Sequence, residues 1–355
     1  MKYVSLFSGI GAFEKAFSNL KIPLELVAYF EIDKYASKAY SLIHGVSESL
    51  NFGDITKFDE NIPVARGDID LITYGFPCQP FSVAGSTQGF EDSKGRGNLF
   101  FDALHVIKHY KPKVAIAENV KNLASKKFAT EFAVILQSLQ SAGYTNYWKI
   151  LNAKNFGVAQ NRERVFIVSV RKDVDTGAFR FPAPYNLHNR LYNYLDTEVP
   201  TKFYLTKTQV AQIKNSKFKQ EYSRIQDKHG VCRTLTVSDY KRPICIQVGQ
   251  MYNENTNPQA GRIYATQGIS PTLDSMQGGN RMPKILLGAG SENVRKLTPL
   301  ECFRLMGFDD KDCQICIDNG ISNTQLYKMA GNSIVVDVLE EIFCMMFDSD
   351  NRLWI

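Results

Sequence analysis

The segment IDLITYGFPCQPFS, residues 69–82, runs from an apolar stretch into a constrained loop. The apolar stretch is typical of a buried strand, which Gly75 ends. Pro77 and Pro80 push the residues before them out of the α region, and neither proline can donate a ladder hydrogen bond. We therefore expect Cys78 on an extended loop beyond a strand. In an open parallel sheet ligands bind at this place, although most free thiols are buried and inert.

A loop rich in glycine and serine follows over residues 82–97 and carries the cations Lys94 and Arg96. Glycine density of this kind suits a segment that changes its backbone conformation. Basic side chains on it suit a polyanionic partner. A plain surface loop would have the same composition, so this stretch alone identifies no partner.

The bulk composition bounds the class of protein. A chain of 355 residues, 44% of them hydrophobic, can form two domains or one large domain with an insertion. Its net charge of +6 is compatible with nucleic-acid binding without identifying it. Seven irregularly spaced cysteines predict no disulfide framework and favour a reducing, intracellular setting. No membrane span and no signal peptide are predicted.

The N-terminal region predicts a βαβ unit with a ligand site at its first turn. The pair Gly9-x-Gly11 follows a strand and opens a helix, so a ligand could approach the backbone closely there. The next strand ends at Glu31, where an acid suits a ribose hydroxyl. Glu14 stands in place of the third glycine of a dinucleotide fingerprint, which disfavours a pyrophosphate. An α/β core without a cofactor is the alternative.

Further carboxylates follow expected strands. A short third strand is expected just before Gly53, and Asp54 after it could accept a hydrogen bond from an adenine amino group or could cap the next helix. Residues 113–117 predict a strand that ends at Glu118. This carboxylate could face the same pocket as Cys78, or it could be a helix cap. Helices are expected over 99–110 and 128–142.

The run Gln160-Asn161-Arg162-Glu163-Arg164 opens a strand over residues 165–170. These arginines can reach the Cys78 pocket only if that strand runs antiparallel to the others. The preceding strand, 144–151, is joined to it without a helical pattern, which favours an antiparallel pair. A solvated charge cluster is the alternative.

The composition changes after residue 184. Residues 185–292 lack βα periodicity and are rich in polar and aromatic residues, which indicates a smaller β-rich domain suited to DNA contacts, or a plain insertion domain. A capped helix is expected next, with Thr298 as N-cap, Pro299 first and Glu301 third. Gly307 would end it.

The C-terminal part contains one close cysteine pair, Cys313-x-x-Cys316, which lies far in sequence from every histidine, so no zinc site is expected. The apolar helix 334–347 must pack against the core.

Six stretches, in their order along the chain, closely resemble the C5-cytosine DNA methyltransferase family of the prokaryotic restriction–modification type. They are Phe7-Ser8-Gly9-x-Gly11, Pro77-Cys78-Gln79, Glu118-Asn119-Val120, Gln160 to Arg164, the helix from Arg295, and a Gly331-Asn332-Ser333 turn. The resemblance implies an α/β fold with a Rossmann-like S-adenosylmethionine-dependent methyltransferase sheet, mostly parallel with one antiparallel strand. A catalytic domain would span 1–184 plus 320–355. A smaller β-rich target-recognition domain would span 185–319, with its variable core at 185–292.

By this resemblance, Cys78 is the nucleophile that adds to C6 of a cytosine flipped out of duplex DNA. Glu118 would hold N3 and the amino group, Arg164 would hold O2, and Arg162 would support Arg164. The resemblance implies S-adenosyl-L-methionine as the cofactor, S-adenosyl-L-homocysteine as the product, and no metal. The implied cofactor residues are Phe7, Ser8, Gly9, Gly11, Glu31, Ile32, Asp54, Ile55, Pro77, Leu99, Asn332 and Ser333. The implied DNA-binding residues are Gln79, Ser82, Lys94, Arg96, Gln259, Arg262 and Thr272.

The implied partner is double-stranded DNA, bound by a monomer in the bacterial cytoplasm. A cognate restriction endonuclease could accompany it genetically, without direct contact. Two alternatives remain at this point: a tRNA cytosine-5 methyltransferase on the same scaffold, and a non-catalytic DNA-binding protein. The length of 185–292 argues against the first, since that branch has a reduced recognition domain. The presence of Cys78, Glu118 and Arg164 argues against the second.

Overall fold

The computed structural model describes residues 1–58, 67–77, 99–204, 247–250, 262–265, 269–271, 284–286 and 294–348. The chain forms two compact units. The first comprises Met1–Asn152, Glu163–Pro184 and Ser333–Ile355, and the second comprises Ala153–Arg162 and Tyr185–Asn332. The chain thus returns to the first unit at Ser333, whereas the sequence pattern placed the return at residue 320. It also contributes the short excursion 153–162 to the second unit.

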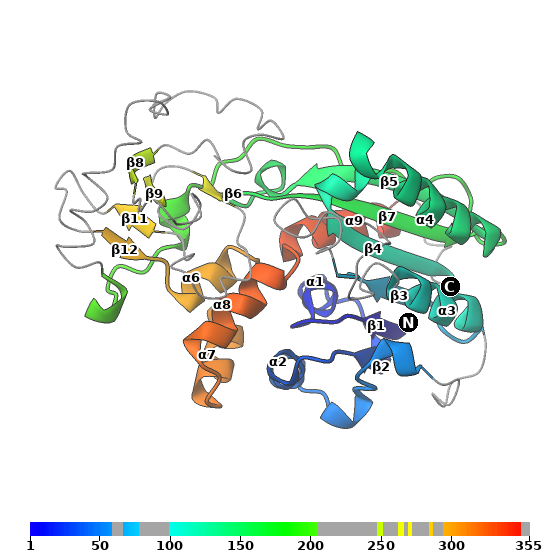
Figure 1. The fold of residues 1–355 in the computed structure, drawn as a ribbon, viewed down its shortest axis with the longest axis horizontal. Helices are drawn as coiled ribbons and strands as arrows, with labels where there is room; N and C mark the ends of the chain where they lie inside the picture. Colours follow the sequence, from blue (N-terminus) through cyan, green and yellow to red (C-terminus); the bar gives the residue numbers. More distant parts are fainter. Residues whose placement is uncertain are drawn as a thin grey trace. The chain divides into compact units, whose positions relative to one another are not determined.

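A six-stranded sheet, in the order β2-β1-β3-β4-β7-β5, forms the centre of the first unit (Figure 1). Its strands are β1 Lys2–Leu6, β2 Glu25–Phe30, β3 Leu71–Tyr74, β4 Val114–Val120, β5 Tyr144–Asn152 and β7 Glu163–Arg171. The strands β1 to β4 pair in parallel, and β7 runs antiparallel to both β4 and β5. The mostly parallel sheet with one antiparallel strand, expected from the sequence, is confirmed.

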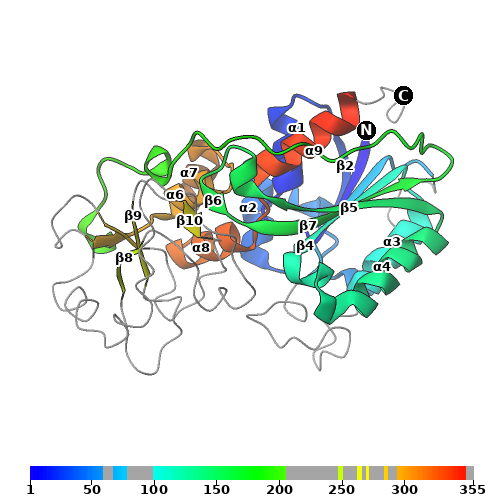
Figure 2. The ribbon, with the colours of Figure 1, turned by 90° about the horizontal axis from the view of Figure 1, so that it is seen from above.

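Helices cover both faces of this sheet. In Figure 2, α1 (Ala12–Asn19) and α9 (Val336–Asp348) lie on one face, and α3 (Leu99–Tyr110) and α4 (Ala129–Ser141) lie on the other. A further helix, α2 (Lys34–His44), follows β2. The alternation along β1 explains the two faces: Val4 joins the cluster that contains residues of α3 and α4, while the Tyr3 ring meets Phe17 of α1. Phe17 in turn stacks on Phe343 of α9 with ring centroids 3.9 Å apart. The apolar C-terminal helix therefore packs against the core, as its composition predicts.

The second unit contains three helices among its described residues: α6 Pro299–Arg304, α7 Asp310–Asp318 and α8 Asn323–Asn332. It also contains a four-stranded sheet in the order β12-β11-β9-β8. These strands are β8 Gln247–Gln250, β9 Arg262–Ala265, β11 Lys284–Leu286 and β12 Val294–Lys296. The excursion supplies β6 (Gln160–Asn161), which pairs in parallel with β10 (Ser270–Pro271).

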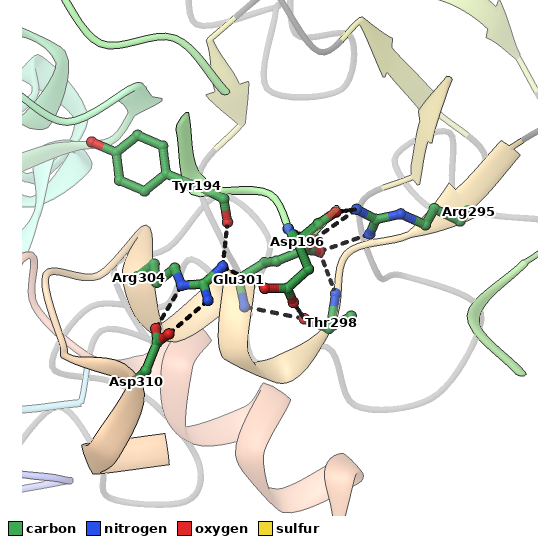
Figure 3. A network of polar contacts seen from close by, with 7 residues as sticks. All are labelled: Tyr194, Asp196, Arg295, Thr298, Glu301, Arg304 and Asp310. Carbon is green, nitrogen blue, oxygen red and sulfur yellow. Dashed lines mark hydrogen bonds and ion pairs between the residues drawn. The ribbon is translucent and has the colours of Figure 1, made fainter. Parts of the chain in front are cut away.

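A closed polar network holds α6 to its surroundings within the second unit (Figure 3). Arg295 and Glu301 form a doubly hydrogen-bonded ion pair, with N–O distances of 2.8 and 2.7 Å, and their side chains are 1% and 0% exposed. The Glu301 carboxylate also accepts from the backbone N–H of Thr298 and of Asp196. Thr298 and Glu301 form the reciprocal capping box that the sequence predicts, with Pro299 as the first helical residue.

Two local expectations were wrong. No named strand precedes Gly53, because the Asn51 side chain takes over the pairing role: its amide accepts from the N–H of Glu31 and Gly53 and donates to the Glu31 carbonyl. Only an isolated bridge between Tyr29 and Asn51 remains there. The expected Gly331-Asn332-Ser333 turn is also displaced, since α8 continues through Asn332.

The close cysteine pair lies inside the second unit. Cys313 and Cys316 are buried, and burial raises the pKa of the Cys313 thiol to about 12. Within the described ranges, no group of three potential metal ligands comes together. No helix in that part of the chain is long and apolar enough to cross a membrane.

Candidate active site

The turn between β1 and α1 has an unusual backbone. Phe7, Gly9 and Gly11 have φ angles of 55°, 56° and 79°. Glycine is favoured at position 11, because other residues rarely adopt its φ and because a Cβ there would crowd the rings of His44 and Tyr40. Phe7 adopts the left-handed region without being glycine, which costs conformational energy and is a feature of functional sites.

Glu31, at the end of β2, supports this turn. Its carboxylate accepts from the N–H of Gly9 at 2.9 Å and from the N–H of Asp33 at 2.7 Å. The neighbouring Ile32 is 77% exposed. An acid and an apolar side chain therefore stand together beside the turn, as the cofactor prediction requires.

Two observations show room for a ligand at the turn. The Ser8 hydroxyl oxygen is buried and has no hydrogen-bond partner among the described residues. A Cβ built on Gly9 would meet nothing within 4 Å. An unsatisfied buried hydroxyl is costly, so these residues fit a polar ligand that approaches the backbone.

Of the two roles expected for Asp54, capping a helix or binding an adenine, the structure shows the first. It caps the 3₁₀ turn Ile55–Lys57 by accepting from the N–H and the hydroxyl of Thr56. These hydrogen bonds lower the pKa of the Asp54 carboxyl. The helix-cap alternative is thus observed, while contact with an adenine stays a prediction. Ile55 is buried beside it, and Leu99 begins α3.

Glu118 and Arg164 meet at the edge of the sheet where β4 ends and β7 begins. Arg164 Nε lies 3.0 Å from Glu118 Oε1, and the side chains are 17% and 11% exposed. This contact exists because β7 runs antiparallel to β4, with Arg164 opposite Val120. The sequence argument that the arginine can reach the pocket only on an antiparallel strand is consistent with this geometry.

The end of β3 lies beside this pair. A Cβ built on Gly75 would lie 3.8 Å from Glu118 Oε2 and 4.0 Å from Cδ1 of Ile334. The Asn119 amide donates to the Phe76 carbonyl at 3.0 Å, so β4 holds the backbone that leads to Pro77. The contributions of Asn119 and Ile334 were not predicted, although Asn119 lies within the Glu118-Asn119-Val120 stretch.

Several predicted site residues cannot be placed. Outside the described residues lie Cys78, Gln79, Ser82, Lys94, Arg96, Gln259 and Thr272. Arg262 is the first residue of β9, and only its backbone is described. The described part of this segment therefore ends at Pro77, two residues after Gly75, which lies near Glu118.

Arg162 is buried beside the end of α8, and its expected support of Arg164 stays a prediction. It is 4% exposed, belongs to the second unit, and donates from Nη2 to the Gly331 carbonyl at 3.0 Å. Gln160, two residues earlier, donates to the Leu305 carbonyl at 2.8 Å. Beyond Gly331, Asn332 is exposed and ends α8, whereas Ser333 is buried and donates to the Ile334 carbonyl at 3.3 Å.

The sheet and its edge define a class of enzyme. The family model described as C-5 cytosine-specific DNA methylase matches residues 1–348, and the chain belongs to this family of cytosine-5 DNA methyltransferases. Among its relatives is the type II methyltransferase M.HhaI of Haemophilus parahaemolyticus, 33% identical over 96% of this chain and 93% of that protein. The orphan methyltransferase M.SPBetaI of Bacillus phage SPbeta is 32% identical over 97% of this chain and 96% of that protein.

A solved structure gives the same fold. The Dnmt2 methyltransferase of S. pombe superposes with a TM-score of 0.67 at 18% identity, covering 98% of each chain. The predicted family, fold class and enzyme class are confirmed.

Proposed function

We propose that this protein transfers a methyl group from S-adenosyl-L-methionine to C5 of a cytosine in double-stranded DNA. The observation that carries the proposal is the Glu118–Arg164 ion pair beside Gly75, in a chain of the cytosine-5 methyltransferase family. A carboxylate and a guanidinium at one point can bind the polar edge of a cytosine. The neighbouring strand β3 leads through Gly75 to Pro77, and Cys78 is the next residue in the sequence.

The turn between β1 and α1 supports the cofactor assignment. S-adenosylmethionine, when bound, supplies an electrophilic methyl group. Glu31 would hold the ribose hydroxyls, and Phe7 with Ile32 would flank the adenine. The buried Ser8 hydroxyl and the open space at Gly9 are the features of this chain that fit such a ligand. Ile55, Leu99, Pro77, Asn332 and Ser333 complete the proposed set.

Cys78 would activate the base. C5 of cytosine is a poor nucleophile, and addition of the thiolate at C6 gives the ring enamine character at C5. A thiol is only slightly ionised at neutral pH, so positive neighbours are needed to lower its pKa. After C5 gains the methyl group, its proton leaves to a base, the C6–S bond breaks and Cys78 is released.

Glu118 and Arg164 would hold the cytosine during this chemistry. Glu118 would bind N3 and the amino group, and a proton shared at N3 makes C6 more electrophilic. Arg164 would bind O2. A stacked base is out of reach of such contacts, so the target cytosine must leave the duplex.

Target recognition is assigned to the second unit, mainly to residues 185–292, in a protein acting as a monomer. Lys94 and Arg96 would contact the DNA backbone, as would Ser82, Arg262 and Thr272, with Gln79 near the target. Gln259 would enter the gap left by the extruded base, because a glutamine amide offers both a donor and an acceptor to the orphan guanine. The relatives of this protein include orphan and type II methyltransferases, so we propose that it acts in a restriction–modification setting.

The function can be tested by bisulfite sequencing of DNA from a host that expresses the protein. Methylated cytosines at one short sequence are expected, and none with Cys78→Ala. A duplex with 5-fluorocytosine at that site should form a denaturation-resistant adduct only when S-adenosylmethionine is present, because fluorine cannot leave as a cation. An adduct with tRNA and with no DNA duplex would overturn the proposal in favour of an RNA substrate.

A further inference from the structure

Gln160 of β6 and Arg162, the residue after β6, each donate a hydrogen bond to the C-terminal end of a helix in the second unit. Gln160 is fully buried and donates to the carbonyl of Leu305, the C-cap of α6. Arg162 donates to the carbonyl of Gly331, the next-to-last residue of α8. The last carbonyls of a helix have no partner within it, so the two side chains serve the same purpose at different helices.

The charge of Arg162 suits this position. The C-terminal end of a helix carries partial negative charge, and a cation there is stabilising, most strongly where water is excluded. Arg162 is 4% exposed, and the guanidinium offers donors in a fixed geometry. The bond therefore fixes the end of α8 more firmly than an exposed contact would.

The residues that follow α8 in the sequence belong to the first unit. Two residues after Gly331 comes Ser333, which is buried, and then Ile334, which is 9% exposed. A Cβ placed on Gly75 would lie 4.0 Å from Cδ1 of Ile334 and 3.8 Å from Oε2 of Glu118, so both side chains lie next to Gly75. Only Asn332 and Ser333 separate the carbonyl held by Arg162 from Ile334 in the sequence.

We propose that Arg162 is a positioning residue for the segment Ser333–Ile334 and, through it, for the cofactor and the floor of the base pocket. Arg164, two residues along, contacts Glu118 and holds the base. The two arginines of one run therefore have separate tasks. The proposal rests on the function proposed above, since it assigns the methionine end of S-adenosylmethionine to Asn332 and Ser333.

The test compares Arg162→Lys with Arg164→Lys in the full-length protein. Arg180→Lys is the control, because Arg180 also donates to backbone carbonyls, those of Gly177 and Phe179, and belongs to no proposed site. The affinity for S-adenosylhomocysteine is measured by calorimetry, and the rate of methyl transfer is measured in a single turnover at saturating cofactor. Hydrogen exchange of the amides of residues 333–335 is followed in parallel.

Arg162→Lys is expected to weaken S-adenosylhomocysteine binding by about tenfold or more, the effect of one lost charged hydrogen bond. It should also accelerate exchange at residues 333–335. Arg164→Lys should keep the affinity and lose the single-turnover rate, and Arg180→Lys should change neither. Arg162→Gln, which keeps an amide donor, provides a second variant if the lysine protein does not fold.

Unchanged affinity and exchange in Arg162→Lys or Arg162→Gln, with a rate loss like that of Arg164→Lys, would overturn the inference and make Arg162 a base-holding residue. Failure of the wild-type protein to bind S-adenosylhomocysteine would instead overturn the proposed function. The two failures are therefore distinguishable.

Discussion

Two glutamate–arginine pairs in this protein have the same chemistry and opposite surroundings. Glu301 and Arg295 are sealed, at 0% and 1% side-chain exposure, and are joined by two hydrogen bonds. Glu118 and Arg164 keep 11% and 17% exposure, and Arg164 Nε lies 3.0 Å from Glu118 Oε1. Within the sealed pair, the Glu301 carboxylate also accepts from the backbone N–H groups of Thr298 and Asp196.

This difference shows how one residue pair can serve structure or chemistry. A buried ion pair resists the loss of either partner, because the remaining charge is left in a medium that solvates it poorly. A partly exposed pair can exchange its partner for a ligand, since water and the ligand can replace the lost contacts. Four substitutions test the comparison.

The largest effect is expected for Glu301→Ala. Removal of this carboxylate leaves Arg295 buried without its counter-charge and should cost about 3–5 kcal/mol of folding free energy. Denaturant unfolding measures the loss. The double variant Arg295→Met with Glu301→Leu should regain part of it, because an apolar pair carries no uncompensated charge. A melting curve of Glu301→Ala that matches the wild type would break the comparison.

Glu118→Gln should affect activity rather than stability. We expect methyl transfer to fall by about 10²–10⁴-fold, as for loss of a group that handles a proton in the reaction. The folding free energy should change by only about 1 kcal/mol, because Arg164 keeps access to water. Single-turnover rates and denaturant unfolding, measured on the same samples, separate a loss of activity from a loss of stability. If the variant lost stability as Glu301→Ala does, the Glu118 pair would be structural.

Asp337, in the first turn of α9, is a carboxylate whose charged neighbours in the described chain are Glu340 and Glu341. Burial, and then these acids, raise its pKa to about 6. Because the folded pKa exceeds the ~3.9 of an unfolded aspartate, the stability from this group is full at low pH and falls as the pH rises toward the folded pKa. Asp337→Asn should therefore stabilise by on the order of 1 kcal/mol at about pH 8 and have little effect at about pH 4. A gain that is equal at both pH values would contradict this assignment.

The smallest effect is expected for Asp310→Asn. Asp310 accepts two hydrogen bonds from Arg304, at 2.6 and 2.7 Å, but its side chain is 57% exposed. An exposed pair contributes less than about 1 kcal/mol, and salt should reduce the difference further. Unfolding at low and high salt provides the measurement, and a loss comparable to that of Glu301→Ala would show that exposure does not separate these pairs.

Local chemistry predicted much of the fold. The capping box at Thr298 and Glu301 depends on residues three apart, and the buried strands follow from continuous apolar runs. Both features can therefore be predicted from the sequence. The contact of Arg164 with Glu118 required one topological step, the antiparallel direction of β7. That step followed from the lack of a helical connection between β5 and β7.

Long-range contacts could not be predicted in this way. Arg162 finds its acceptor 169 residues away, at a carbonyl that any residue type would offer. The resemblance therefore grouped Arg162 with Arg164, although the two side chains have different partners. Asn51 shows the same limit on a smaller scale, because a side-chain amide that replaces strand pairing leaves no pattern of alternation.

The excursion 153–162 has a consequence for how such enzymes can evolve new specificities. Because β6 pairs with β10, part of the second unit is encoded upstream of the segment 163–184, which belongs to the first. Recombination that replaced residues 185–332 alone would bring in a foreign β10 opposite the resident β6. Successful exchange therefore selects for donors whose β10 backbone accepts the resident Gln160–Asn161, or for a second, matching crossover upstream. The second unit, to which we assign target recognition, is thus encoded in two linked pieces, which limits the relatives with which it can be exchanged.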